Sequence, residues 1–269
     1  MLLAARAPCQ HNPVEYFTHP AVVPILGFLV GLVGAVVGVG GGFFIVPYLL
    51  FARTGVPMEA TGTSLVLVTL NAVSATIRNA RQKQILWRLG SIMGIATLPG
   101  AFLGTELIRG MNVGLFQICF GILLAGSAAY ALIISAAKIP EDPSRMRIHM
   151  GAAVLVSLAT GFVSSMFGVG GGVIHVPLMM FAFLVPGRMS TSTSQFAMLY
   201  AVVLGAAVFA FRGTVLWDMV LLMAPGVVIG AQIGAWATSK VKGSIIRRAF
   251  AAICLVVSIQ MILKGWGSA

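Results

Sequence analysis

The sequence predicts an all-α polytopic membrane protein with two inverted repeats, each made of a re-entrant helical hairpin and three transmembrane helices. Three observations predict this fold: an apolar composition, an internal repeat, and an uneven distribution of Lys and Arg. Of the 269 residues, 59% are hydrophobic and 9% are charged, and the mean hydropathy is +1.01. A water-soluble core does not require so much apolar surface, so lipid is the expected solvent.

Short polar connections separate the apolar stretches, and none is long enough to fold as a soluble domain. They lie near residues 53–60, 78–89, 109–111, 138–149, 186–190, 212–214 and 239–244. We therefore divide the chain into an N-terminal tail (1–20), a first membrane repeat (21–137), a connecting loop (138–147) and a second membrane repeat (148–265). The tail lacks the charged-then-apolar order of a cleavable signal peptide.

The repeat is visible when the chain is compared with itself. The stretch GVGGGFFIVP at 38–47 recurs as GVGGGVIHVP at 168–177, with seven of ten positions identical and an offset of 130 residues. The same offset aligns TGTS at 61–64 with TSTS at 191–194, and the Leu-Trp pair at 86–87 with the pair at 216–217. Duplicated halves of this kind are typical of secondary transporters.

Each repeat opens with an apolar run, 21–51 or 150–185, which GVGGG interrupts. A single helix of roughly 30 residues would span about 45 Å, more than a hydrocarbon core of about 30 Å. Four glycines in five positions also disfavour a helix interior. Each arm then has about a dozen residues, too few to cross. We therefore predict re-entrant hairpins whose glycine tips lie near the bilayer midplane.

The basic residues test this topology. Three crossings per half place 12 of the 17 Lys and Arg on one side and 5 on the other, whereas single crossings of the broken segments would give 10 and 7. The positive-inside rule favours the first arrangement. It places residues 78–88 and 240–248 in the cytoplasm and both termini outside, in a multi-pass membrane protein.

The glycine tips are the candidate substrate site. Main-chain N–H groups inside lipid need partners, and a helix that starts at a tip presents free N–H groups and a partial positive charge. Glycine allows positive φ and close approach of an anion, although small residues also serve helix packing. The Thr/Ser clusters would cap helices or donate to a substrate. The substrate-binding candidates are Gly38, Gly40, Gly41, Gly42, Gly168, Gly170, Gly171, Gly172, Thr61, Thr63, Ser64, Thr191, Thr193 and Ser194.

His175 stands in the second glycine motif where the first has Ile45. It is either a neutral, hydrogen-bonded packing residue or a proton-coupling group. We expect no catalytic residue, metal or cofactor, because the three cysteines lack zinc spacing and the six acidic residues lie in or near connections and chain ends. The expected partners are a small anionic substrate, a coupling ion (H⁺ or Na⁺) and the lipid bilayer. The +11 net charge is too dispersed for nucleic acid, and the oligomeric state stays open.

The paired GxGGGxxxxP pattern, at 38–47 and 168–177 and followed each time by a Thr/Ser cluster, resembles the sulfite exporter TauE/SafE family of membrane transporters. The likeness covers nearly the whole chain after residue 20. It implies transport of sulfur-containing anions, such as sulfite or organosulfonates, across a bacterial plasma membrane and driven by an ion gradient. A passive anion channel and a membrane-embedded enzyme are the alternatives.

Overall fold

A computed structural model of the chain describes residues 22–136, 146–237 and 243–267, and these ranges are helical with no strand. The predicted all-α membrane class is confirmed, because six helices in these ranges are long and apolar enough to cross a membrane. Those six are α3 (Pro57–Arg81), α4 (Trp87–Leu107), α5 (Val113–Ala136), α6 (Met150–Phe167), α8 (Gly187–Phe211) and α9 (Trp217–Ala237). The chain closes with α10 (Gly243–Gly267), and the 3-10 turn η3 (Ile108–Gly110) extends α4.

The apolar run that opens each repeat is broken at its glycines, as the sequence predicts. The pieces are α1 (Val22–Val37), α2 (Gly42–Leu49) and η2 (Leu50–Thr54) in the first repeat, and α6, α7 (Gly172–Pro177) and η5 (Leu178–Ala182) in the second. The expected arm length is wrong for the leading arms, because α1 has 16 residues and α6 has 18. At about 1.5 Å per residue, α6 approaches the thickness of a hydrocarbon core, so its length alone does not keep it from crossing.

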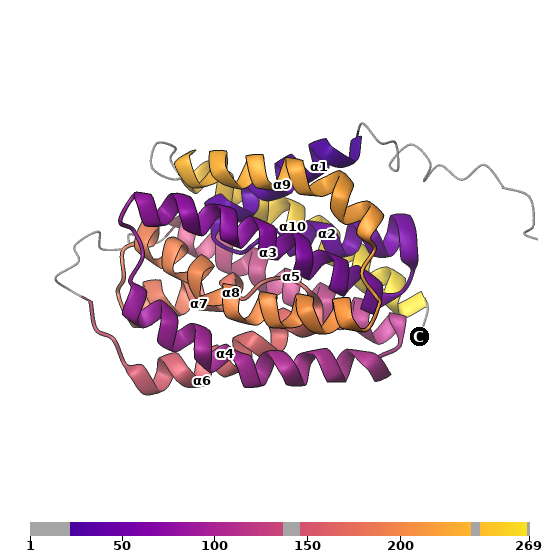
Figure 1. The fold of residues 1–269 in the computed structure, drawn as a ribbon, viewed down its shortest axis with the longest axis horizontal. Helices are drawn as coiled ribbons and strands as arrows, with labels where there is room; N and C mark the ends of the chain where they lie inside the picture. Colours follow the sequence, from indigo (N-terminus) through magenta and orange to yellow (C-terminus); the bar gives the residue numbers. More distant parts are fainter. Residues whose placement is uncertain (1–21, 137–145, 238–242, 268–269) are drawn as a thin grey trace, which may run out of the picture.

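The helices run along the long axis of the molecule, and their connections gather at its two ends (Figure 1). At the left end in Figure 1, α3 turns into α4, and α6 and α8 begin. Two hydrogen bonds tie these segments together, from the Leu86 N–H to the Thr193 hydroxyl (3.0 Å) and from the Arg147 N–H to the Phe183 carbonyl (2.9 Å). We call this the basic end, because it carries Arg78, Arg81, Lys83, Arg88, Arg147 and Arg188.

At the opposite end, α3 and α9 begin, and η2, η3 and α8 finish. Arg53 pairs with Asp218 at 2.7 Å, and Glu106 pairs with both Arg109 and Arg212. We call this the ion-paired end. Half-exposed Trp87 and Trp217 lie at opposite ends, where indole rings favour a membrane interface.

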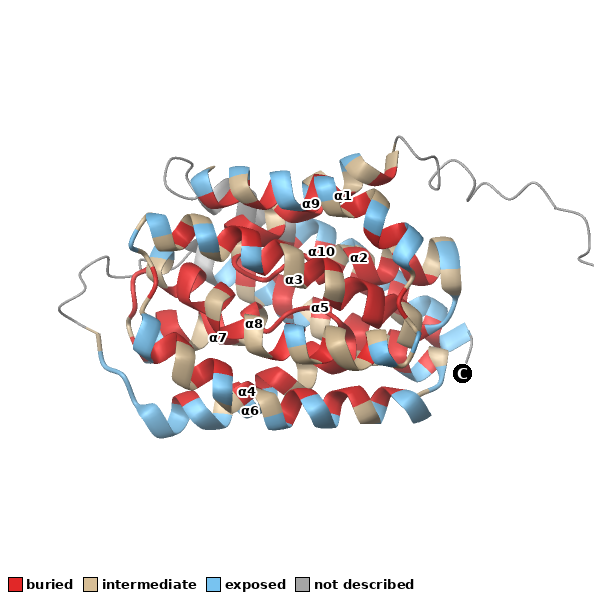
Figure 2. Ribbon diagram, in the orientation of Figure 1, coloured by how far each residue is buried: buried red, intermediate tan, exposed pale blue. Residues whose placement is uncertain are grey.

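Helices of one repeat pack mainly against helices of the other: α1 against α9, α4 against α6, α3 against α8 and α5 against α10. Small residues allow these close approaches. Gly226 and Gly230 of α9 lie against the main chain of Pro24 and Phe28 in α1. Gly100 and Gly104 of α4 lie in the same way against α6. Figure 2 shows the result, with buried segments in the middle of the molecule and exposed residues along the outer helices α6 and α9.

Candidate functional site

The two glycine breaks meet in the middle of the molecule. We call residues 38–41 the first glycine loop and residues 168–171 the second glycine loop. A Cβ atom on Gly42 would overlap the Gly168 carbonyl oxygen, and a Cβ atom on Gly172 would overlap that of Gly38. Only glycine permits this approach of two backbones. The contacts on the two sides are related by the 130-residue offset found in the sequence.

Positive φ angles accompany most of the loop glycines, with values of 82° at Gly38, 93° at Gly40, 70° at Gly168 and 81° at Gly170. The same expectation is wrong for Gly171, whose φ is −69°. A Cβ atom on Gly171 would instead lie 2.5 Å from the Thr160 methyl group. Space, rather than backbone conformation, therefore excludes a side chain there.

Several main-chain N–H groups at the glycine loops have no hydrogen-bond partner in the part of the chain that the structure describes. The Gly34 carbonyl accepts the N–H groups of Gly38 and Val39 at 3.0 and 3.1 Å, and the Ser164 carbonyl accepts those of residues 168 and 169. The following N–H groups, those of residues 41–42 and 170–172, have no hydrogen-bond partner among the described residues. Lipid and apolar side chains cannot satisfy an N–H group, so water or a ligand has to do so.

Four residues of the predicted Thr/Ser clusters lie against the glycine loop of the other repeat. The Ser64 hydroxyl donates to the Gly168 carbonyl at 2.7 Å, and the Ser194 hydroxyl donates to the Gly38 carbonyl at 3.4 Å. Thr61 and Thr191 would touch Cβ atoms built on those same two glycines. Ser64 and Ser194 therefore hold the loops in place, and each donates its single hydroxyl hydrogen to a loop carbonyl.

The other two threonines lie elsewhere. The Thr63 hydroxyl accepts the Leu216 N–H at 2.9 Å, and the Thr193 hydroxyl accepts the Leu86 N–H at 3.0 Å. These N–H groups stand at the starts of α9 and α4, so Thr63 and Thr193 satisfy free donors of helices in the other repeat. The predicted capping of their own helices is wrong, because α3 begins at Pro57 and α8 at Gly187.

Two buried amides fasten the first glycine loop and the end of α1 that leads into it. The Asn71 side chain donates to the Gly40 carbonyl at 2.8 Å, and the Gln195 side chain donates to the carbonyls of Gly34 and Ala35 at 3.2 and 3.0 Å. The second loop lacks such amides, because the equivalent positions hold Ala201 and Leu65. The sequence signal for both residues is an uncharged amide inside an apolar helix, which usually bonds a neighbouring element.

Buried polar atoms without a partner surround the two loops. They include Thr61 Oγ1, Asn71 Oδ1, Ser164 Oγ and His175 Nδ1. The other ring nitrogen of His175 lies 3.1 Å from Ser157 Oγ. Sequence reasoning missed Ser157 and Ser164, whose signal is a polar stripe with Thr160 at i, i+3 and i+7 on α6. Buried polar groups normally have partners, so this region has capacity for water or a polar ligand.

No group of three His, Cys, Asp or Glu side chains in residues 22–136, 146–237 and 243–267 could hold a metal ion. The described Lys and Arg residues lie at the two ends of the molecule, away from the glycine loops. The donors around the loops are therefore main-chain N–H groups, hydroxyls and two side-chain amides. Such donors suit an oxyanion that is bound and released without a permanent counter-charge.

The sequence of the chain matches a known family over most of its length. The family described as sulfite exporter TauE/SafE matches residues 23–261. The chain belongs to this family. It is therefore a member of a family of membrane transporters, and the resemblance seen in the glycine motifs is confirmed.

Several related proteins are described as probable membrane transporter proteins. The chain is 27% identical to the probable membrane transporter protein YunE of Bacillus subtilis, over 91% of this chain and 97% of the relative. A probable membrane transporter protein of Xylella fastidiosa is 28% identical over 91% and 94%. The corresponding protein MJ0441 of Methanocaldococcus jannaschii is 33% identical over 59% and 60%. No solved structure matches the chain.

Proposed function

We propose that this chain is a secondary transporter that moves a small anion, a sulfur oxyanion or an organosulfonate, across the plasma membrane. One observation carries the proposal: the unpaired N–H groups of residues 41–42 and 170–172 lie where the two loops contact each other at the buried centre of the molecule. Sulfite and sulfonate groups present several oxygen acceptors, which suit a cluster of N–H and O–H donors. The family's description as sulfite exporters supports the same substrate class.

The proposal includes two inverted repeats with re-entrant hairpins. The second broken segment starts and finishes at the basic end, where Arg147 is bonded to Phe183. The return arm of the first finishes at the ion-paired end, where Arg53 meets Asp218. The second segment therefore returns to the end at which it began, and this return supports a re-entrant hairpin. The basic end is then cytoplasmic, by the positive-inside rule.

His175 is the proposed coupling group. Its Nδ1 atom is buried without a partner, and its ring lies beside the Cβ position of Gly171. A proton on this ring would add positive charge next to the second glycine loop and strengthen anion binding there. Binding of the anion and of the proton would therefore favour each other.

The test is flux in proteoliposomes that contain the purified protein. Sulfite, a short alkanesulfonate, sulfate, a small carboxylate and Na⁺ would be offered separately, with and without a proton or Na⁺ gradient. We expect saturable, gradient-driven uptake of sulfite or the sulfonate. Uptake of the carboxylate or Na⁺ with none of the sulfur anions would contradict the proposed substrate class. Flux that no gradient can drive uphill would indicate a channel.

A further inference from the structure

A cavity of about 30 Å³ lies beside the glycine loops on the side of the basic end. It has room for about two water molecules. The end of α1 contributes Val36 and Val37, the first glycine loop contributes Val39, α7 contributes Val173 and Val176, and α8 contributes Thr191. Met180 of η5 also lines the cavity, and the C-terminal half of α5 completes the wall with Ser127, Tyr130 and Ala131.

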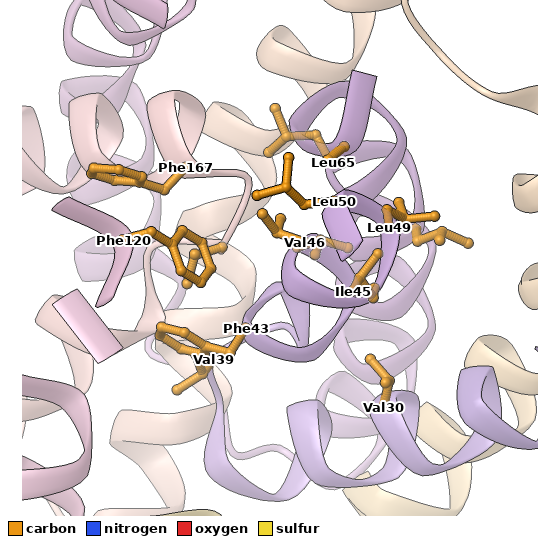
Figure 3. Close-up of a cluster of buried hydrophobic side chains, with 14 of the residues drawn as sticks. Val30, Val39, Phe43, Ile45, Val46, Leu49, Leu50, Leu65, Phe120 and Phe167 are labelled. Carbon is orange, nitrogen blue, oxygen red and sulfur yellow. The ribbon is translucent and has the colours of Figure 1, made fainter. Parts of the chain in front are cut away.

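The equivalent positions of the other repeat are filled. The 130-residue offset takes Val37 to Phe167 and Val173 to Phe43. Both phenylalanines are buried, and Figure 3 shows them in one group with Phe120. The ring centroids of Phe116, Phe120 and Phe167 lie 5.5 to 5.8 Å apart. We call Phe43, Phe116, Phe120 and Phe167 the phenylalanine cluster.

One face of α5 joins the cluster to the cavity. Its buried residues, three or four positions apart, are Phe116, Phe120, Leu124, Ser127 and Ala131. The side chains become smaller along this face. The helix α5 begins after η3 at the ion-paired end, and Tyr130 packs on Phe181 of η5 near the basic end. The part of this face with small side chains, which borders the cavity, is therefore nearer the basic end.

We propose that the cavity is the path by which substrate reaches the glycine loops from the basic end, and that the phenylalanine cluster closes the matching path from the ion-paired end. This inference rests on the proposed transport function. Side chains in a well-packed interior leave few voids. A void at one of two equivalent positions, beside unpaired donors, marks the side on which the site is accessible. Opening the other side requires Phe43 and Phe167 to separate from α5.

Cysteine accessibility tests the direction of access without any substrate. Cys9, Cys119 and Cys254 would be replaced, and Ser127→Cys would be introduced as a nearly isosteric probe of the cavity. A charged, membrane-impermeant thiol reagent would be applied to each side of oriented vesicles. Lys83→Cys and Arg53→Cys would mark the basic end and the ion-paired end in parallel samples.

We expect Ser127→Cys to react only from the side that modifies Lys83→Cys. Reaction from the Arg53→Cys side, or from neither side, would overturn the inference. Because this assay measures no flux, it can fail while sulfur-anion transport stands. It can equally succeed in a protein that transports a different anion.

Exchanging Val173 and Phe43, which occupy equivalent positions, tests whether the phenylalanine cluster acts as a gate that closes the path from the ion-paired end. Val173→Phe fills the cavity, and we expect loss of flux in a protein that keeps its helical circular dichroism and elutes as a single species. Phe43→Val loosens the phenylalanine cluster, and we expect Ser127→Cys to become reactive from both sides. Full flux in Val173→Phe, or unchanged one-sided reactivity in folded Phe43→Val, would refute the gate.

Discussion

Val37 and Val173 border a cavity, whereas the residues at the equivalent positions of the other repeat, Phe167 and Phe43, fill a phenylalanine cluster. The glycine loops between them make matched contacts, with Ser64 on one loop and Ser194 on the other. The repeat therefore preserves the backbone of the site, while a few side chains distinguish its two approaches. Val37 and Val173 leave space where Phe167 and Phe43 remove it.

The largest effect is expected where the loops are equivalent. Gly42→Val and Gly172→Val each place a side chain on a carbonyl of the opposite loop, so both should abolish flux and lower the free energy of unfolding by about 3 kcal/mol or more. Flux assays and unfolding in detergent would measure this. Gly126→Val is the matched control, because a Cβ atom there meets nothing within 4 Å. Tolerance of one loop variant but not the other would break the equivalence of the loops.

A second prediction compares the packing of the phenylalanine cluster with the packing around the cavity. Phe120→Ala removes a fully buried ring from the phenylalanine cluster and should cost about 3–5 kcal/mol of unfolding free energy. Val173→Ala borders existing space and removes fewer contacts, so its cost should be about 1 kcal/mol. Reversible unfolding in mixed micelles would measure both. Equal losses would show that the two walls are packed alike.

The hydrogen bonds from Ser64 and Ser194 to the glycine loops allow a comparison of smaller effects. Ser64→Ala removes a 2.7 Å hydrogen bond to the second glycine loop and should cost about 1 kcal/mol of unfolding free energy. Ser194→Ala removes the longer 3.4 Å contact and should cost less. Thermal unfolding of the two variants side by side would rank them. The reverse order would mean that the first glycine loop depends on Ser194 more than its distance indicates.

The smallest effect on stability is expected at His175. His175→Gln keeps a polar side chain near Ser157, so the unfolding free energy should change by no more than about 1 kcal/mol. Flux should continue but lose its dependence on the proton gradient. Proteoliposome flux with and without that gradient would measure this. Unchanged dependence would leave His175 with a packing role.

Much of the fold could be predicted from local patterns. The breaks after Val37 and Phe167 follow from glycines that a helix interior disfavours. Trp87 and Trp217 begin α4 and α9, which start at opposite ends of the molecule, and the two Leu-Trp pairs align at the repeat offset. The contacts of Thr63 and Thr193 could not be predicted, because their partners, Leu216 and Leu86, belong to the other repeat.

The sequence by itself determined the helical class, the two repeats and the glycine motifs, because composition, periodicity and a constant offset are properties of the chain alone. The tertiary structure decided which hydroxyls face the glycine loops and which hold helix ends, since that depends on how α3 and α8 pack together. It also decided that Val173 borders a cavity while Phe43 fills its equivalent. Whether a position is empty depends on side chains from several helices at once, and no single stretch of sequence contains that information.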